Sequence, residues 1–301
     1  MPSLALQRST ALASLVYAAT LWGLIWYPYR LLDEAGVGGV ASSFFSYAVP
    51  LVVFGWLHGR SLYAARGRWA WLIALALVAG WTNLAYVLAM LQGEVVRVLL
   101  LFFLSPLWTV LFSRLLLGER LNRVGVWVMA LSLGGAMVML WQPNGELPLP
   151  RNAAEWLALS AGVAFALSNV ISRHLSGVAD GARSVAIWAG VLVLTVVGLA
   201  VSPAELDFTA GAGAGVWLLL AGVGLAIGSV TYAVQYGLAR VPANQAIVIF
   251  LFELVVAAVA AYFLAHERMG LQEWAGALMI VTASLFSGHM EDEQTKEPSH
   301  A

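Results

Sequence analysis

The residues able to do chemistry are a few polar side chains set within long apolar stretches. Glu253 is the clearest of them, because it is the only charged residue between 243 and 265. An ionised carboxylate at the centre of a membrane helix costs about 3 kcal/mol. Glu253 could therefore pair with a substrate ammonium group or carry a proton. It could equally be a hydrogen-bonded group that holds two helices together, and the sequence leaves both interpretations open.

Polar and aromatic residues also recur at helical spacing in other apolar stretches. Asn83 and Tyr86 are three positions apart, so they share a helix face. Trp22 and Trp26 are four apart and could form a wall for a flat ring, or could instead face lipid or fill the core. Buried amides also serve helix packing, at about 0.6 kcal/mol each. The candidate substrate-binding residues are Trp22, Trp26, Asn83, Tyr86, Ser105, Trp108, Phe165, Asn169, Thr231, Tyr232, Gln235 and Glu253.

Several kinds of site are excluded by the residues present. The chain has no cysteine, which rules out disulfides, thiol catalysis and cysteine-ligated zinc. His174, His266 and His289 lie at the ends of apolar stretches and form no metal-ligand pattern. A glycine-rich phosphate loop ending in Lys-Ser or Lys-Thr is missing as well. We therefore expect no cofactor and no metal, and the net charge of −1 gives no reason to expect a nucleic-acid partner.

The elements that must position these residues are membrane helices. Hydrophobic residues make up 61% of the 301 positions and charged residues 10%, against about 25% charged residues in soluble proteins. The mean hydropathy is +0.84. A stretch of about 20 apolar residues crosses a bilayer. We predict an all-α fold, a polytopic membrane protein of ten transmembrane helices at 10–31, 38–57, 69–91, 95–117, 123–141, 153–173, 183–201, 214–238, 243–265 and 271–289.

The arginines predict the orientation of these helices. With the N-terminus inside, ten arginines fall on the inner side, while only Arg30, Arg97, Arg151 and Arg268 fall on the outer side. Cytoplasmic loops of membrane proteins carry an excess of basic residues. We therefore expect a multi-pass protein of the cell inner membrane with both termini in the cytoplasm.

The pattern of apolar stretches occurs twice along the chain. Residues 115–120 (Leu-Leu-Leu-Gly-Glu-Arg) are similar to residues 263–268 (Phe-Leu-Ala-His-Glu-Arg), at an offset of 148. Two copies of a unit with an odd number of crossings lie in opposite membrane orientations, as in transporters whose substrate site lies between the repeats. We predict a first five-helix repeat at 1–150, an inverted second five-helix repeat at 151–290 and a disordered cytoplasmic tail at 291–301.

Short motifs give the chain a family resemblance. They are Trp22-Gly23, Leu104-Ser105-Pro106, Leu117-Gly118-Glu119, Phe252-Glu253 and His266-Glu267. Ten spans that carry these motifs resemble the drug/metabolite transporter superfamily, specifically its EamA-type members. The chain has Leu254 where the family's Leu-Glu-Pro pattern has proline. A hinge or kink is therefore predicted at Pro106 in the fourth stretch, and no proline kink is predicted in the ninth.

The resemblance implies a secondary transporter and not an enzyme. The chain is also similar to the aromatic amino acid exporters of this family, which implies export of amino acids, including aromatic ones, by alternating access through a central cavity. A broad-specificity drug or metabolite exporter of the same fold is the alternative. A lipid-modifying enzyme would need a motif such as His-Glu-x-x-His, which the sequence lacks. The expected partners are a small-molecule substrate and the lipid bilayer, with the protein as a monomer.

Overall fold

The computed structural model describes residues 4–93, 95–141, 149–264 and 270–290. Within these ranges the chain is almost entirely helical and forms no β-strand, in agreement with the predicted all-α class. The helices before residue 142 are α1 (Leu4–Glu34), α2 (Gly39–Ala64), η1 (Arg66–Arg68), α3 (Trp69–Gln92), α4 (Val95–Phe102), α5 (Ser105–Leu116) and α6 (Arg123–Met139). Those after residue 148 are α7 (Ala153–His174), α8 (Asp180–Val201), η2 (Pro203–Ala210), α9 (Ala214–Leu238), α10 (Ala243–Phe250), α11 (Phe252–Leu264), α12 (Leu271–Phe286) and η3 (Ser287–His289). The predicted tail at 291–301 lies outside the described residues.

Eight segments of the described chain are long and apolar enough to cross a membrane. They are Leu6–Glu34, Gly39–Ala64, Arg66–Gln92, Arg97–Leu116, Ala153–His174, Asp180–Val201, Ala214–Leu238 and Ala243–Leu264. The apolar helix α6 is shorter, at 17 residues, and α12 has 16. The chain is thus a multi-pass membrane protein, and each of the ten predicted stretches overlaps one helix or one pair of consecutive helices.

The fourth predicted stretch is interrupted between α4 and α5, just before Pro106. Proline has no N–H and so leaves the carbonyl of the residue four positions earlier, Phe102, without its helical partner. Gly162 of α7 lies against that carbonyl, and a Cβ atom at this position would be 2.6 Å from the Phe102 oxygen. Only a residue without a side chain therefore allows α7 to approach the break this closely.

The ninth predicted stretch is also interrupted, at Leu251 between α10 and α11, although it contains no proline. Leu254 in place of the family's proline left a kink in this stretch open, and the structure shows a break there without a proline. The Leu254 N–H donates to the Leu251 carbonyl, which closes a tighter turn than the α-helix. Ser284 Oγ of α12 donates to the Val248 carbonyl at 3.4 Å. Neighbouring serine side chains can satisfy carbonyls released from a membrane helix, so this break depends on tertiary contacts and not on a local motif.

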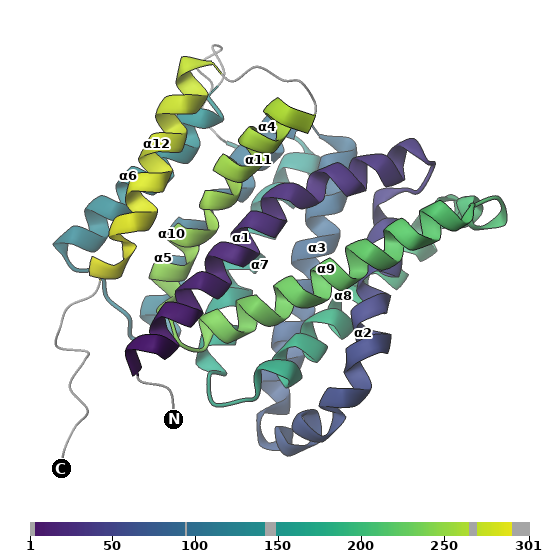
Figure 1. Cartoon of the computed structure of the whole chain (residues 1–301), viewed down its shortest axis with the longest axis horizontal. Coiled ribbons are helices and arrows are strands. Elements are labelled where there is room, and N and C mark those ends of the chain that lie inside the picture. Colours follow the sequence, from purple (N-terminus) through teal and green to yellow (C-terminus); the bar gives the residue numbers. More distant parts are fainter. Residues whose placement is uncertain (1–3, 94, 142–148, 265–269, 291–301) are drawn as a thin grey trace.

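Helices before residue 142 and helices after residue 148 pack in matching ways. The helix α3 packs against α7 and α8, and α9 likewise packs against α1 and α2. The helix α5 packs against α7, as α11 packs against α1. The helices α6 and α12 pack mainly on each other and lie together at the left edge of the bundle (Figure 1). The two interrupted stretches therefore lie nearer the middle of the protein than α6 and α12.

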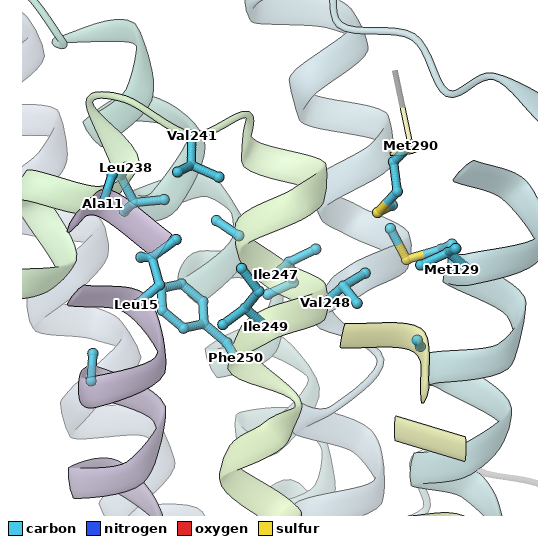
Figure 2. Close-up of a cluster of buried hydrophobic side chains, with 14 of the residues drawn as sticks. Ala11, Leu15, Met129, Leu238, Val241, Ile247, Val248, Ile249, Phe250 and Met290 are labelled. Atoms are coloured by element: carbon cyan, nitrogen blue, oxygen red, sulfur yellow. The ribbon is translucent and has the colours of Figure 1, made fainter. Parts of the chain in front are cut away.

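A buried apolar cluster joins several helices at one end of the bundle. It contains Leu15 of α1, Met129 of α6, Leu238 of α9 and Phe250 of α10, together with Met290 (Figure 2). The start of α1 and the end of α12 lie at this same end (Figure 1). The helix α10 is thus held between α1 and the pair formed by α6 and α12, which fixes the position of the break that follows it.

Candidate functional site

Aromatic rings meet between the two helix breaks. Phe102 ends α4 and Phe250 ends α10, and these positions differ by 148, the offset of the sequence repeat. The ring of Phe165 in α7 lies 5.4 Å from Phe102 and 6.0 Å from Phe250. Tyr86 of α3 lies 4.9 Å from Phe102. Tyr86, Phe102, Phe165 and Phe250 therefore form one aromatic cluster, to which four helices contribute one ring each.

Glu253 lies beside this aromatic cluster. It is the second residue of α11, three positions after Phe250, and its carboxylate interacts electrostatically with the Tyr86 hydroxyl. Gly23 of α1 lies against the Glu253 carbonyl, and a Cβ atom at this glycine would be 2.7 Å from that oxygen. Among the described residues Glu253 makes no hydrogen bond and no ion pair. An ionisable side chain within a membrane segment that lacks a protein partner is a default candidate for a functional site.

Five of the predicted residues carry a buried polar atom that has no hydrogen-bond partner in the described part of the structure. The atoms are Trp26 Nε1, Asn83 Oδ1, Trp108 Nε1, Asn169 Nδ2 and Gln235 Oε1. They belong to α1, α3, α5, α7 and α9, which pack against one another. An unpaired buried polar group costs about 1–3 kcal/mol, and most such groups in folded proteins are paired. Three of these atoms are donors and two are acceptors.

Two predicted residues in α9 do not share the environment of Gln235. Tyr232 is 41% exposed, and its ring stacks on His58. Thr231 donates its hydroxyl to the carbonyl of Ile227 in its own helix, at 2.8 Å. Successive residues of an α-helix point about 100° apart, so residues three or four positions apart share a face. By this spacing Gln235 lies on the same side of α9 as both Thr231 and Tyr232, and their role in one substrate site stays a prediction.

The remaining predicted residues lie close to the helix breaks. Trp22 packs against the apolar cluster that includes Phe250. Ser105 is buried at the start of α5, next to Pro106 in the first turn. Offset by 148, Ser105 corresponds to Glu253, so the two breaks carry different polar residues at equivalent positions. This asymmetry gives the candidate site one acidic side and one neutral side.

Sequence reasoning missed three residues that the structure brings to the candidate site. Phe102 and Phe250 resemble ordinary core residues in an apolar stretch, and only the offset of 148 links them. Tyr47 of α2 is 5% exposed, and its hydroxyl interacts with the Asn83 side chain. The spacing of Ser43, Ser46 and Tyr47 on one helix face was a usable signal.

A carboxylate joins the two halves at the end of the bundle that holds the apolar cluster. Glu119, in the α5–α6 loop, accepts a hydrogen bond from the Ala243 N–H at the start of α10 (3.0 Å). It also pairs with Arg173 of α7 at 3.5 Å, and Arg173 donates to the Ala239 carbonyl at 2.7 Å. Burial raises the pKa of the Glu119 carboxyl above its ordinary value, against the opposing charge of Arg173. We call this arrangement the Glu119 contact.

A fully buried arginine lies at the same end. Arg183, near the start of α8, donates to the carbonyls of Ser172 in α7 and Gln235 in α9 and pairs with Asp180. Asp180 also pairs with Arg240 at 3.3 Å. These bonds tie together the ends of α7, α8 and α9. Over the described ranges, no three His, Asp or Glu side chains are grouped so that they could hold a metal ion.

Comparison with known proteins gives independent information. The "Riboflavin transporter" of Rhizobium johnstonii is 27% identical over 248 residues, which cover 81% of this chain and 74% of that protein. "Protein RarD" of Streptomyces exfoliatus is 28% identical over 287 residues, which cover 87% of this chain and 83% of that protein. A solved structure, described as the crystal structure of a protein, has a TM-score of 0.70 at 17% identity over 93% of this chain and 96% of that one. Because the sequence identity is only 17%, this last similarity concerns the fold alone.

A family match covers both halves of the chain. The description "EamA-like transporter family" matches residues 9–141 and, a second time, residues 152–288. The five unpaired polar atoms and the aromatic cluster all lie within these two ranges. Neither relative is named as an amino acid exporter, so that narrower substrate stays a prediction. The match to the family confirms the broader resemblance, and the chain belongs to the EamA-like transporter family.

Proposed function

We propose that this protein exports small organic metabolites across the cell inner membrane by alternating access, with amino acids, including aromatic ones, as the first candidate substrates. Proteins of its family are transporters and not enzymes. The observation that carries the proposal is the set of buried polar atoms without partners, on helices that pack around the aromatic cluster. A transported ligand that supplies those missing partners explains why the chain keeps them.

The chemistry of the site suits a zwitterion with a planar side chain. The unpaired carboxylate of Glu253 is an acceptor for a substrate ammonium group. The indole N–H groups of Trp26 and Trp108 and the amide Nδ2 of Asn169 are donors for a carboxylate. Aromatic pairs favour offset or edge-to-face contacts at about 4.5–7 Å between centroids, and the aromatic cluster already holds its rings at such distances. A substrate ring would extend the same packing.

The architecture that serves this function is ten transmembrane helices in two inverted five-helix repeats, at 1–150 and 151–290. Two family matches, one in each half, and the matching packing of α3 and α9 support this arrangement. The helices α6 and α12, at 17 and 16 residues, serve as the fifth span of each repeat, and a short span is accommodated by local thinning of the bilayer. Both termini are placed in the cytoplasm, on the side rich in arginine.

A broad-specificity metabolite exporter is the second candidate, and one observation favours it. The acceptors Asn83 Oδ1 and Gln235 Oε1 have no role in binding an amino acid backbone, whose donors pair with Glu253. They suit a neutral heteroaromatic ring that has N–H groups at its edge. One relative is named a riboflavin transporter, and a flavin belongs to that chemical class.

Counterflow in proteoliposomes distinguishes the two candidates. Purified protein is reconstituted with internal unlabelled phenylalanine, and uptake of labelled phenylalanine is measured against external tryptophan, glycine or riboflavin. Inhibition of labelled phenylalanine uptake by external tryptophan supports amino acid export. No labelled amino acid uptake, together with riboflavin counterflow, would establish the second candidate. Absence of all counterflow by protein that reconstitutes as a folded monomer would contradict both.

A substitution at Glu253 tests energy coupling. If Glu253 carries protons and does not bind the substrate, Glu253→Gln abolishes the dependence of uptake on a pH gradient and leaves counterflow exchange intact. If Glu253 binds the substrate ammonium group, the same substitution lowers counterflow as well. The matched control is Glu34→Gln, which removes an exposed carboxylate paired only with Arg30. Gradient dependence that persists in Glu253→Gln would exclude this residue as the proton carrier. Transport that never responds to a pH gradient would indicate facilitated export down a concentration gradient.

A further inference from the structure

A cavity of about 380 Å³ lies between two segments of the chain, and no member of the aromatic cluster lines it. One wall is formed by residues of 61–68, at the end of α2 and in η1, and the other by residues of 174–179, at the end of α7 and in the turn that leads to α8. Arg68, His174 and Ser61 are its polar lining residues, and the others are glycine, alanine, leucine and valine. No residue placed in the substrate site lines this cavity, so transport of the substrate does not account for it.

The cavity is electropositive. Between Ala35 and Gly93 the chain carries Arg60, Arg66 and Arg68 and no acidic residue. Arg66 donates to the Tyr63 hydroxyl, whereas the Arg68 guanidinium has no hydrogen bond or ion pair with any described residue. The cavity therefore offers one uncommitted guanidinium to a ligand and has no carboxylate in its lining.

The nearest acid does not neutralise this charge. Asp180 follows the cavity wall directly, but one carboxylate oxygen is taken by Arg183 and the other by Arg240. The His174 ring packs on Trp71 at 4.6 Å between centroids, which keeps its position in the wall fixed. An anion that enters the cavity thus meets Arg68 and His174 with no competing negative group in the lining.

The cavity lies at the ends of candidate membrane spans, where a headgroup layer is expected. Its lining includes residues at the end of the span Gly39–Ala64 and at the start of the span Arg66–Gln92. Tyr63 and Trp69, which adjoin lining residues in the sequence, are 67% and 47% exposed. Tryptophan and tyrosine concentrate at membrane–water interfaces, at the level of the headgroups. Basic pockets between membrane helices on one face of the bilayer bind anionic lipid headgroups.

We propose that this cavity between residues 61–68 and 174–179 binds an anionic phosphate ester, supplied by the headgroup of a membrane phospholipid, with Arg68 as the principal contact. The volume accommodates a glycerophosphate group, and the exposed aromatic side chains flank the path that the acyl chains follow into the bilayer. This site is separate from the transported substrate and does not depend on the proposed function.

Native mass spectrometry of the delipidated full-length protein in a neutral detergent tests the proposal. We expect phosphatidylglycerol to bind more tightly than phosphatidylcholine. Arg68→Gln should lower the affinity for phosphatidylglycerol about fivefold, as expected for one arginine near the membrane surface, and Arg68→Lys should restore most of it. The matched control is Arg60→Gln, which removes the same charge from an exposed position outside the cavity and should leave the affinity within about twofold.

Equal losses in Arg68→Gln and Arg60→Gln would overturn the proposal, because they would indicate a diffuse charge effect. Equal binding of both lipids to the wild type would overturn it as well. Glycerol 3-phosphate is added as a soluble competitor to separate the two sources of phosphate ester. If it binds as tightly as phosphatidylglycerol, the lipid is rejected as the source. Because Arg68 is exposed and has no protein partner, its substitution leaves folding unchanged, which the charge-state distribution checks in the same spectra.

Discussion

Under the proposed function, Trp108 is a residue that favours ligand binding at the expense of stability. Its indole N–H is buried and has no partner in the described structure. Trp108→Phe keeps an aromatic ring and removes the donor. We expect the substrate concentration for half-maximal uptake to rise about tenfold, the loss of one hydrogen bond of about 1.4 kcal/mol. The thermal unfolding temperature should stay the same or rise, because an unpaired buried donor has been removed.

Trp127→Phe is the matched control for this residue-scale prediction. Trp127, on α6, is 77% exposed and faces away from the candidate site. Neither the uptake curve nor the unfolding temperature should change when it is replaced. A lower unfolding temperature with unaltered uptake in Trp108→Phe would mean that the indole serves packing and not the substrate.

The two interrupted stretches are the elements next to the candidate site. The close approach of α7 to the break between α4 and α5 requires glycine at position 162. Gly162→Ala should destabilise the protein by about 1–3 kcal/mol, because the new Cβ overlaps the Phe102 carbonyl at the α4–α5 break. Gly222→Ala in α9 is the control, since no atom lies within 4 Å of a Cβ there. Alanine is the better helix former by about 0.5–1 kcal/mol, so that variant should be neutral or more stable. Thermal unfolding in detergent measures both, and equal midpoints would contradict the tight approach.

The Glu119 contact predicts a pH dependence at the level of elements. Because burial raises the pKa of this carboxyl, folding favours its protonated form. Its contribution to stability is complete below the ordinary pKa and is lost as pH rises through the raised value. In Glu119→Gln the side chain stays neutral at every pH. The unfolding temperature of the wild type should therefore fall relative to that of the variant as pH rises from the ordinary glutamate pKa through the raised value. Parallel curves would rule out this linkage, and Glu34→Gln, at an exposed ion pair, is the control.

At the scale of the whole molecule, labelling tests the proposed inverted arrangement of the two repeats. The chain lacks cysteine, so single cysteines can be introduced at Ala35 in the α1–α2 loop and at Ser176 in the α7–α8 turn, both exposed. These positions follow the first helix of each repeat. We expect a membrane-impermeant maleimide to label Ala35→Cys on intact cells and Ser176→Cys only after permeabilisation. Labelling of both from the same face would refute opposite orientations of the two repeats.

Much of this fold could be predicted from sequence, but the candidate site only in part. The sequence alone shows polar or amphipathic residues within apolar stretches, and burying each of their polar groups in a membrane helix costs free energy. These residues are Trp26, Asn83, Trp108, Asn169 and Gln235. Tyr232 satisfies the same criterion, yet its ring is 41% exposed and stacks on His58 of α2, a contact that the sequence does not show. The break at Leu251 has no proline to predict it, and Ser284 from another helix donates to the Val248 carbonyl next to it.

The sequence by itself determined that the chain is a helical membrane protein of the EamA-like family, because transfer of each apolar stretch into lipid depends on that stretch alone. It also determined that the pattern occurs twice. The tertiary structure decided which polar atoms remain unpaired, where α10 ends and how Phe102, Phe165 and Phe250 come together. Those outcomes depend on contacts between residues that are far apart in the chain. The energies of such contacts cannot be derived from a short stretch of sequence.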